Sequence, residues 1–272
     1  MENGVAEQGF PVGAIDTSKP HPARMYDYYL GGRDNYEVDR EAAERVIEMA
    51  AEARPSARAN RQLLLRAVRH VVRQGVRQII DIGTGIPTSP NTHEAAREIA
   101  PDVRVAYVDN DPIVATHAGA KLTNTTGTAF VLADARQPRT ILDHPEIRSL
   151  IDFDQPVAVL LVAVLHFIKD EEDPAGIVGT LRDALPAGSY LVLTHGTTDF
   201  HGDGGGDASE VYKAATATLN LRDQAAVEAL FAGFELLEPG VVQAPLWRPD
   251  GPVADAAESH RVAFYGGVGI KR

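Results

Sequence analysis

The sequence predicts an α/β fold: a Rossmann-like, doubly wound sheet of seven mostly parallel strands, with an antiparallel C-terminal hairpin and a helical N-terminal cap. Three observations predict this fold. Short apolar runs alternate with helical patterns from residue 75 onward, which is typical of βαβ units. The run over 157–164 is apolar throughout, as in a central strand covered on both faces. The run over 78–82 leads directly into a turn with two glycines, as the first strand of such a sheet does.

The first quarter of the chain is predicted to be helical. Residues 1–20 are rich in Gly, Pro and polar residues without a period, so we expect a flexible arm. A helical cap is expected over 21–74, with two helices separated by Gly31 and Gly32 and then a longer helix. Residues 75–272 form the Rossmann-like domain, and we expect the cap and this domain to pack as one structural unit.

Turn residues and apolar runs place the elements of the second part. Asp111 and Asp173 each precede a proline, and an Asp N-cap followed by Pro is a typical helix start. The glycine-rich stretch 201–207 is expected to be a mobile loop, followed by a helix over 208–219. Only a long loop joins the last two strands, so we expect them to pair antiparallel. The expected strands are 78–82, 103–108, 129–133, 157–164, 190–194, 234–237 and 262–267.

The composition argues against several classes of protein. With no cysteine among 272 residues, the chain forms no disulfides, thiolate zinc sites or iron–sulfur clusters. The formal charge of −12 argues against a nucleic-acid partner, because phosphate binding needs a basic surface. No stretch approaches the roughly 18 apolar residues that span a bilayer, and the N-terminus does not resemble a secretory leader, so we expect a cytoplasmic protein with no membrane partner. We interpret one arginine-rich helix as a solvated face rather than a nucleic-acid contact; its arginines are Arg54, Arg58, Arg61, Arg66, Arg69 and Arg73.

The strongest local signal is IIDIGTG, in which an apolar strand runs into Asp-x-Gly-x-Gly. Glycines at this position let the backbone approach a ligand beyond the strand end. The third glycine of a nicotinamide fingerprint is missing, with Pro87 nearby. Asp81 would repel a pyrophosphate but attract the sulfonium and ammonium of S-adenosylmethionine. The alternative is that Asp81 only organises the turn by accepting from backbone N–H groups.

Two further carboxylates end the next two predicted strands. Asp109 stands where an acid reaches ribose hydroxyls, and Asp134 stands within reach of an adenine amino group. Asp111 competes with Asp109 but is better used as a helix cap. Three acids at three consecutive strand ends favour an S-adenosylmethionine site. The predicted cofactor-binding residues are Asp81, Gly83, Thr84, Gly85, Asp109, Asn110, Asp134 and Ala135.

Three histidines are candidates for roles near the reaction. Methyl transfer from a sulfonium needs positioning more than a catalytic group, although a base helps with a hydroxyl or ammonium acceptor. His166 follows the strand 157–164 and is the candidate catalytic residue, with a structural role equally open. His195 ends the next strand and is expected to line the site. His93 is expected to accompany a helix cap formed by Asn91 and Glu94. No spacing resembles H-E-x-x-H, and no metal is expected.

The cap contributes an aromatic, hydrogen-bonding surface. Its candidate substrate or lid residues are Tyr26, Tyr29, Asn35 and Tyr36. Hinged at the two glycines, the cap could close over the cofactor and exclude water. The alternative is that these tyrosines are simply packed between the cap and the sheet.

Several strings together carry a family resemblance, namely ARMYDYYLGGRDNYEVDR, IIDIGTGIPT, VAYVDNDPIV, LADARQP and PVAVLLVAVLHFIKD. The chain resembles, from about Ser18 to its end, a family of actinobacterial S-adenosylmethionine-dependent methyltransferases long labelled a domain of unknown function. The resemblance implies a seven-stranded methyltransferase sheet with an N-terminal cap. It also implies cofactor contacts by Asp81, Gly83, Gly85, Asp109 and Asp134, and it implies no substrate. Pro87 replaces the third glycine of the wider methyltransferase motif, so the path of the following residues is open.

The leading functional hypothesis is an S-adenosylmethionine-dependent methyltransferase with a small-molecule acceptor. The acidic surface, the aromatic cap and the lack of an Asp/Asn-Pro-Pro-aromatic motif favour it. The second hypothesis is a protein that binds S-adenosylmethionine without turnover, because no catalytic base is unambiguous. The third is a nicotinamide-dependent oxidoreductase, which any Rossmann-like glycine turn admits. The oligomeric state and the acceptor are not predicted.

Overall fold

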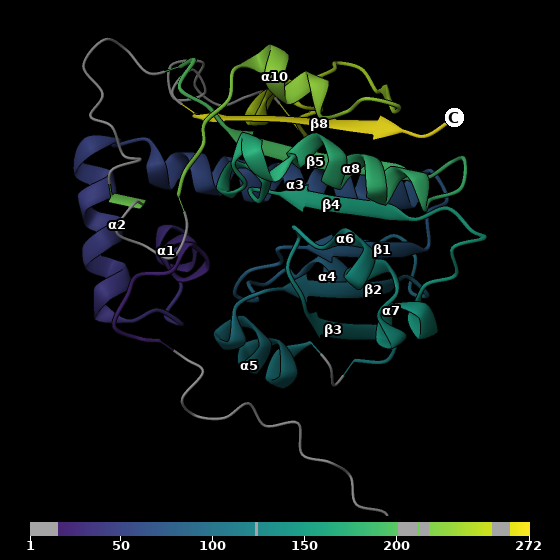
Figure 1. Ribbon diagram of the computed structural model, residues 1–272, viewed down its shortest axis with the longest axis horizontal. Coiled ribbons are helices and arrows are strands. Elements are labelled where there is room, and N and C mark those ends of the chain that lie inside the picture. The colour runs from purple at the N-terminus through teal and green to yellow at the C-terminus, as the bar shows by residue number, and fades with distance from the viewer. Residues whose placement is uncertain (1–15, 123–124, 201–210, 213–217, 252–261) are drawn as a thin grey trace, which may run out of the picture.

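The computed structural model describes residues 16–122, 125–200, 211–212, 218–251 and 262–272. In this part of the chain one sheet has the strand order β3-β2-β1-β4-β5-β8-β6, and β7 pairs with β8 (Figure 1). Strands β1 to β5 pair parallel, whereas β8 runs antiparallel to β5, β6 and β7. The strands are β1 (Gln78–Ile82), β2 (Arg104–Asp109), β3 (Thr128–Leu132), β4 (Ala158–Val162), β5 (Tyr190–Gly196), β6 (Glu235–Leu236), β7 (Val242–Gln243) and β8 (Phe264–Ile270).

The helices begin where the turn chemistry predicts. Asp111 and Asp173 accept hydrogen bonds from the N–H groups of Ile113 and Gly176, and each is followed by a proline in the first turn. The described α-helices are α1 (Pro22–Tyr29), α2 (Glu37–Met49), α3 (Ala53–Arg73), α4 (Thr92–Arg97), α5 (Pro112–Lys121), α6 (Pro138–Leu142), α7 (Pro145–Leu150), α8 (Pro174–Asp183) and α10 (Gln224–Ala229). Short 3₁₀ turns are η2 (Leu165–Phe167), η3 (Asp170–Glu172) and η4 (Ala244–Leu246).

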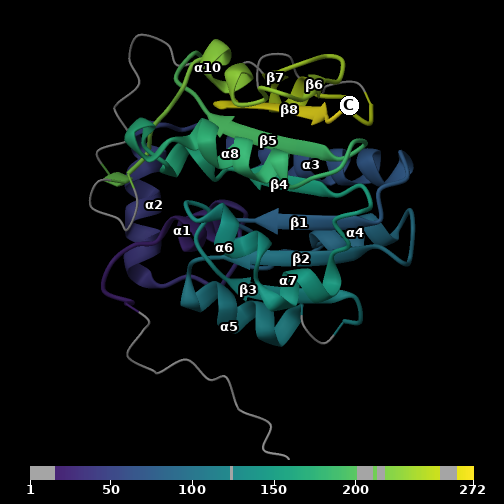
Figure 2. The ribbon, with the colours of Figure 1, turned by 45° about the vertical axis from the view of Figure 1, so that its right-hand side comes forward.

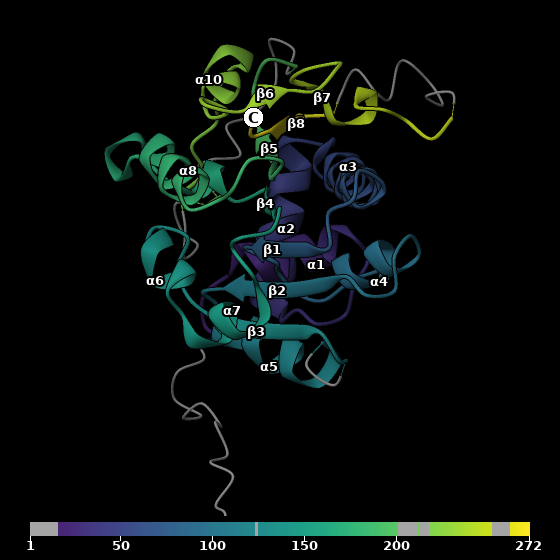
Figure 3. The ribbon, with the colours of Figure 1, turned by 90° about the vertical axis from the view of Figure 1, so that its right-hand side faces the viewer.

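Helices cover both faces of the sheet, and alternate strand residues supply the two cores. Ile79 of β1 packs in one buried cluster with Leu63 of α3. The next residue, Ile80, packs in the opposite cluster with Ile141 of α6 and Leu181 of α8. Figure 3 shows α3 and α4 on one side of the strands and α6, α7, α8 and α10 on the other. This arrangement confirms the doubly wound α/β fold.

Helices α1 and α2 lie beyond the carboxyl ends of the parallel strands (Figures 1 and 2). Met25, Tyr29 and Val46 bury their side chains together with Ala57, near the start of α3. Further along the same helix, residues such as Leu63 pack on the sheet. Helix α3 therefore takes part in both clusters, while the division into a cap over 21–74 and a domain over 75–272 stays a prediction.

The predicted antiparallel pairing of the last two expected strands is confirmed, because β6 pairs antiparallel with β8, which lies between β5 and β6. The structure adds β7, a two-residue strand that the sequence pattern did not predict. Two residues are too short to show an alternation. Close packing also depends on glycine: a Cβ at Gly266 would lie 2.4 Å from Leu63 Cδ1, and one at Gly269 would lie 2.8 Å from Phe234 Cβ.

Some predicted segments lie outside the described residues. They are most of the expected arm, at 1–15, the glycine-rich stretch 201–207, and most of the helix expected over 208–219. Among the helices that are described, none is long and apolar enough to cross a membrane.

Candidate cofactor and acceptor site

A cavity of about 490 Å³ is lined by residues at the carboxyl ends of β1, β2 and β4 and by residues of α1 and α3. Roughly 300–1,000 Å³ is usual for a small-molecule site. The structure brings most of the predicted site residues to its wall. They are Asp81, Gly83, Thr84, Gly85, Asp109, Asn110, Asp134 and Ala135 from the sheet edge, Tyr26 and Tyr29 from the cap, and His166 after β4.

The glycine turn after β1 is bonded to the neighbouring strand. The N–H groups of Gly83 and Thr84 donate to the carbonyl of Val108 at 2.7 and 3.1 Å. Gly83 and Gly85 have φ angles of +72° and +68°, which glycine adopts without the usual penalty. A Cβ at Gly83 would lie 2.3 Å from Val164 Cγ2, whereas one at Gly85 would have no atom within 4 Å. The backbone at Gly85 therefore borders open space that a ligand can approach.

Asp81 is a buried carboxylate on the cavity wall. Its Oδ2 accepts from Thr92 Oγ1 at 2.6 Å and from Thr84 Oγ1 at 3.5 Å. Burial raises the pKa of Asp81 above its ordinary value, while these bonds and the charge of Arg61 lower it. Its hydrogen bonds within the described chain come from hydroxyls, so none of them supports the alternative in which it bonds turn N–H groups. A cationic ligand would offset the cost of burying this charge.

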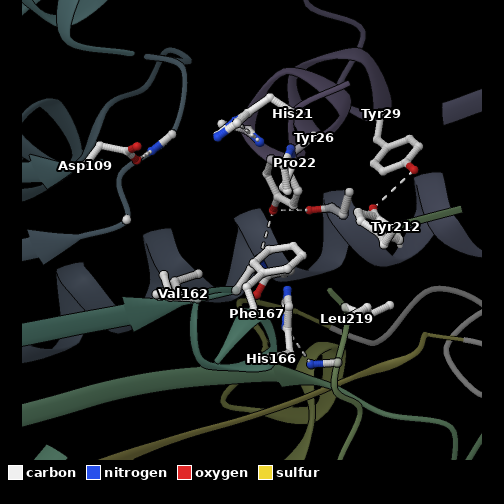
Figure 4. A pocket seen from close by; sticks show the side chains of 18 of the residues that line it. His21, Pro22, Tyr26, Tyr29, Asp109, Val162, His166, Phe167, Tyr212 and Leu219 are labelled. Atoms are coloured by element: carbon white, nitrogen blue, oxygen red, sulfur yellow. Dashed lines mark hydrogen bonds between the residues drawn. The ribbon is translucent and has the colours of Figure 1, made fainter. Parts of the chain in front are cut away.

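Asp109 fastens the glycine turn to the end of β2. Its Oδ2 accepts from the N–H of Gly85 at 2.8 Å, and its Oδ1 accepts from the N–H of Asp111 at 3.0 Å. Burial raises the pKa of Asp109 to about 6, against the opposing effect of these hydrogen bonds. Figure 4 shows this carboxylate and its bond to the turn.

Asp134 lies on the more exposed rim of the cavity. Its Oδ2 accepts from Asn110 Nδ2 at 3.3 Å and from Arg136 Nη1 at 2.9 Å. Nε of Arg136 also lies 2.7 Å from Oε1 of Glu172, in η3. The carboxylate of Asp134 is thus already partnered by a cation, which the sequence argument did not include.

His166 and His195 bond to the two backbone polar groups of Gly196 in opposite roles. The N–H of Gly196 donates to His166 Nδ1 at 3.1 Å, so that nitrogen carries a lone pair. The carbonyl of Gly196 accepts from His195 Nδ1 at 2.7 Å, and Arg222 Nη1 donates to His195 Nε2 at 2.8 Å. Burial lowers the pKa of His166 well below its ordinary value, and burial lowers the pKa of His195 to about 4. Both rings are therefore neutral, with fixed and different tautomers.

Three predicted substrate or lid residues do not line the cavity. His195 is fully buried with both ring nitrogens bonded inside the protein. Asn35 Nδ2 donates to Asp27 Oδ2 at 2.7 Å, and Tyr36 is the N-cap residue of α2, with 43% of its surface exposed. Asn35 and Tyr36 follow the turn at Gly31 and Gly32, where the N–H of Gly32 donates to the carbonyl of Asp27 at 2.8 Å, and neither of them lines the cavity.

The two cap tyrosines that do reach the cavity are held by hydrogen bonds. Tyr26 donates to the carbonyl of Ala57 at 2.9 Å and accepts from Asn60 Nδ2 at 2.8 Å. The hydroxyls of Tyr29 and Tyr212 lie 3.4 Å apart (Figure 4). Tyr26 is therefore both packed against α3 and part of the wall.

Sequence reasoning missed several wall residues. Arg61 donates from Nη2 to the carbonyl of Pro90 at 2.6 Å, and its Nε is buried without a partner among the described residues. Ala163, just after β4, has a φ of +59°, a strained conformation for alanine.

The expected solvated arginine face is wrong at Arg66, which is buried and donates to the carbonyl of Trp247 at 3.0 Å. Contacts from distant segments produce all of these features, so only the dense arginine pattern hinted at them.

His93 and its neighbours agree with the predicted cap. Asn91 and Glu94 form a capping box at the start of α4. His93 is buried and its Nδ1 lies 2.7 Å from the hydroxyl of Tyr107.

Comparison with known proteins identifies the family. The S-adenosyl methyltransferase family model matches residues 10–272. A DUF574 family protein from Streptomyces avermitilis is 45% identical, with 94% of this chain and 99% of that chain covered and a TM-score of 0.90. A protein from Thermobifida fusca assigned as a methyltransferase is 40% identical, with 96% and 98% covered and a TM-score of 0.89. An O-methyltransferase family protein from Burkholderia thailandensis, 14% identical, shares the fold over 90% of this chain and 63% of its own, with a TM-score of 0.53. Comparison with curated proteins gave no match. The chain therefore belongs to the S-adenosyl methyltransferase family and is an S-adenosylmethionine-dependent methyltransferase.

Proposed function

We propose that this protein methylates a small-molecule acceptor inside the cavity between the cap and the sheet. The observation that carries the proposal is one continuous cavity whose wall holds both the glycine turn after β1 and the aromatic residues of the cap. Its size suits a cofactor with a small acceptor, and the net charge of −12 does not suit a nucleic acid. A cytoplasmic location and the lack of a nucleic-acid or membrane partner stay predictions.

The residues at the strand ends fit S-adenosylmethionine. Asp81 would hold the ammonium or sulfonium charge, and the open space at Gly85 would admit the ligand close to the backbone. Asp109 and Asp134 would face the adenosine part. The cation of Arg61, on the same wall, would hold a carboxylate. The bound cofactor supplies a methyl group on a sulfonium, a leaving group that needs no further activation.

The remaining wall would position the acceptor. Tyr26, Tyr29, Phe167, Tyr212 and Phe264 make this part aromatic. A dry, shaped wall brings the acceptor atom into line and keeps water from competing for the methyl group. Positioning of this kind supplies much of the acceleration in a displacement of an activated leaving group.

Calorimetry with S-adenosylmethionine and S-adenosylhomocysteine tests the cofactor site. Wild-type protein should bind both, and Asp81→Asn should bind S-adenosylmethionine at least about tenfold more weakly, or about 1.4 kcal/mol. Asp102→Asn, at an exposed carboxylate that lies 3.5 Å from Arg77 Nε, is the matched control and should bind like wild type. A wild-type protein that binds neither compound would contradict the proposal.

Turnover is tested separately with a metabolite extract and isotope-labelled S-adenosylmethionine. The label should appear in a low-molecular-weight product. Label found only in protein or nucleic acid would overturn the small-molecule acceptor while leaving cofactor binding intact.

A further inference from the structure

We propose that His166 presents a hydrogen-bond donor, not a base, to the acceptor, and that the acceptor is a planar phenol bound as its phenolate. This inference rests on the proposed function, since it specifies the acceptor of the same cavity. Its starting observation is the hydrogen bond from the N–H of Gly196 to His166 Nδ1.

The tautomer of His166 follows from that bond. A backbone N–H only donates, so Nδ1 accepts and the neutral ring carries its proton on Nε2. The ring also lies between aromatic neighbours, with centroid distances of 4.3 Å to Phe167, 5.5 Å to His195 and 5.6 Å to Phe264. Turning the ring over would place a carbon against the Gly196 N–H and leave that buried donor unpaired, at a cost of about 1–3 kcal/mol.

The Nε2–H faces the cavity. Figure 4 shows one ring nitrogen of His166 in the bond marked by a dashed line and the other directed the opposite way, into the space between Phe167 and Leu219. Within the described part of the chain, the hydrogen bond to the His166 ring is made at Nδ1. The lone pair on Nδ1 already accepts the Gly196 N–H. His166 can therefore donate a hydrogen bond to the acceptor molecule through Nε2–H, but it has no free lone pair with which to remove a proton from that molecule.

The aromatic side chains around His166 favour an acceptor molecule with a planar aromatic ring. Phe167, Phe264 and Tyr212 border the same part of the cavity as His166. The hydroxyl of Tyr26 already donates to Ala57 and accepts from Asn60. The Nε2–H of His166, set among aromatic side chains, complements a ring that carries an electron-rich oxygen, which the N–H stabilises most when the oxygen is ionised.

The methyl transfer then requires no proton transfer to His166. The phenol loses its proton to solvent as it binds, because the Nε2–H favours the anion. The phenolate oxygen then donates an electron pair to form the new O–CH₃ bond as the S–CH₃ bond breaks. The products are an aryl methyl ether and S-adenosylhomocysteine.

Two substitutions of His166 distinguish the donor that faces the cavity, Nε2–H, from the hydrogen bond between Nδ1 and the Gly196 N–H. In His166→Gln the amide nitrogen lies near the place of Nε2 and keeps a donor in the cavity. In His166→Asn the shorter amide can still accept from the Gly196 N–H but does not reach the cavity. A base would be lost in both variants, whereas a donor is lost only in the second.

The test uses 4-nitrophenol, whose anion and neutral form have different absorption spectra, added to protein saturated with S-adenosylhomocysteine. Bound to wild type, its ionisation should shift at least about tenfold toward the anion, or about 1.4 kcal/mol. His166→Gln should keep most of this shift and His166→Asn should lose it. Calorimetry should show unchanged S-adenosylhomocysteine binding in both variants, which verifies their folding.

Failure of this inference is distinguishable from failure of the proposed function. If S-adenosylhomocysteine does not bind, the cofactor site is wrong. If it binds while 4-nitrophenol does not bind, stays neutral, or ionises equally with His166→Asn, the phenolate proposal is overturned. ¹⁵N NMR of the histidine rings gives an independent readout: a proton on Nδ1 of His166 would also overturn it.

Discussion

Gly196 donates its N–H to Nδ1 of His166 at 3.1 Å, which joins the end of β5 to the turn that follows β4. The carbonyl of the same glycine accepts from His195. The N–H and the carbonyl of one residue, Gly196, thus assign opposite tautomers to two neighbouring imidazoles, because an N–H can only donate and a carbonyl can only accept. Of these two histidines, only His166 reaches the cavity.

Gly196→Ala should impair acceptor binding more than cofactor binding. Its Cβ would lie 2.9 Å from Leu221 Cδ2 and so push this wall residue toward the cavity. We expect the free energy of unfolding to fall by about 1–2 kcal/mol. Denaturant unfolding and 4-nitrophenol titration measure the two effects. Gly179→Ala in α8, where the nearest atom would be Arg182 Nη2 at 3.9 Å, should instead stabilise by about 0.5–1 kcal/mol. Unchanged 4-nitrophenol affinity in Gly196→Ala would contradict the expected displacement of Leu221 toward the cavity.

Alanine substitution at the two glycines of the turn should have different effects: Gly83→Ala should mainly lower stability, and Gly85→Ala should mainly weaken S-adenosylmethionine binding. Gly83→Ala combines a left-handed φ with a Cβ 2.3 Å from Val164, so we expect a loss of about 2–4 kcal/mol in unfolding free energy. Adding Val164→Ala should restore part of it. Gly85→Ala has room for its Cβ, so its stability loss should stay near 1–2 kcal/mol while S-adenosylmethionine affinity falls at least about tenfold. Wild-type affinity in Gly85→Ala would show that the cofactor does not approach this backbone.

Asp109 should make the protein more stable as the pH falls. Burial raises its folded pKa to about 6, above the unfolded value near 4, so between these pH values the folded state binds more protons. The free energy of unfolding then falls as pH rises from about 4 to about 6, by at most about 3 kcal/mol. Comparing unfolding of wild type and Asp109→Asn across this range isolates the effect, because the amide does not titrate. Parallel pH curves for the two proteins would refute the assignment.

Arg61 should recognise a carboxylate of the cofactor. Its Nε is buried without a partner in the described part of the chain, and its charge lowers the pKa of Asp81. Arg61→Met should therefore weaken S-adenosylmethionine binding about tenfold or more, and it should weaken binding of the decarboxylated analogue much less. Arg58→Met, at an exposed position on the same helix, is the control and should leave both affinities unchanged. Equal losses for the two compounds in Arg61→Met would show that the guanidinium acts on the fold and not on the carboxylate.

The wall of the cavity at the strand ends was predictable from sequence because its signals are local. Asp81, Asp109 and Asp134 each follow an apolar strand, and the carboxyl ends of parallel strands meet at one edge of a sheet. The residues of the turn and the helix caps at Asp111 and Asp173 likewise depend on neighbours within a few positions. The fold and the strand ends were therefore determined by the sequence pattern itself.

Only the tertiary structure decided what these positions can do. The tautomer of His166 depends on Gly196, thirty residues later in the chain, and Arg136, which partners Asp134, is also bonded to Glu172, 36 residues later. Arg61 belongs to the site and Asn35 does not, although both stand in the predicted cap. Hydrogen bonds and burial between distant segments set these roles, and no periodicity along the chain records them.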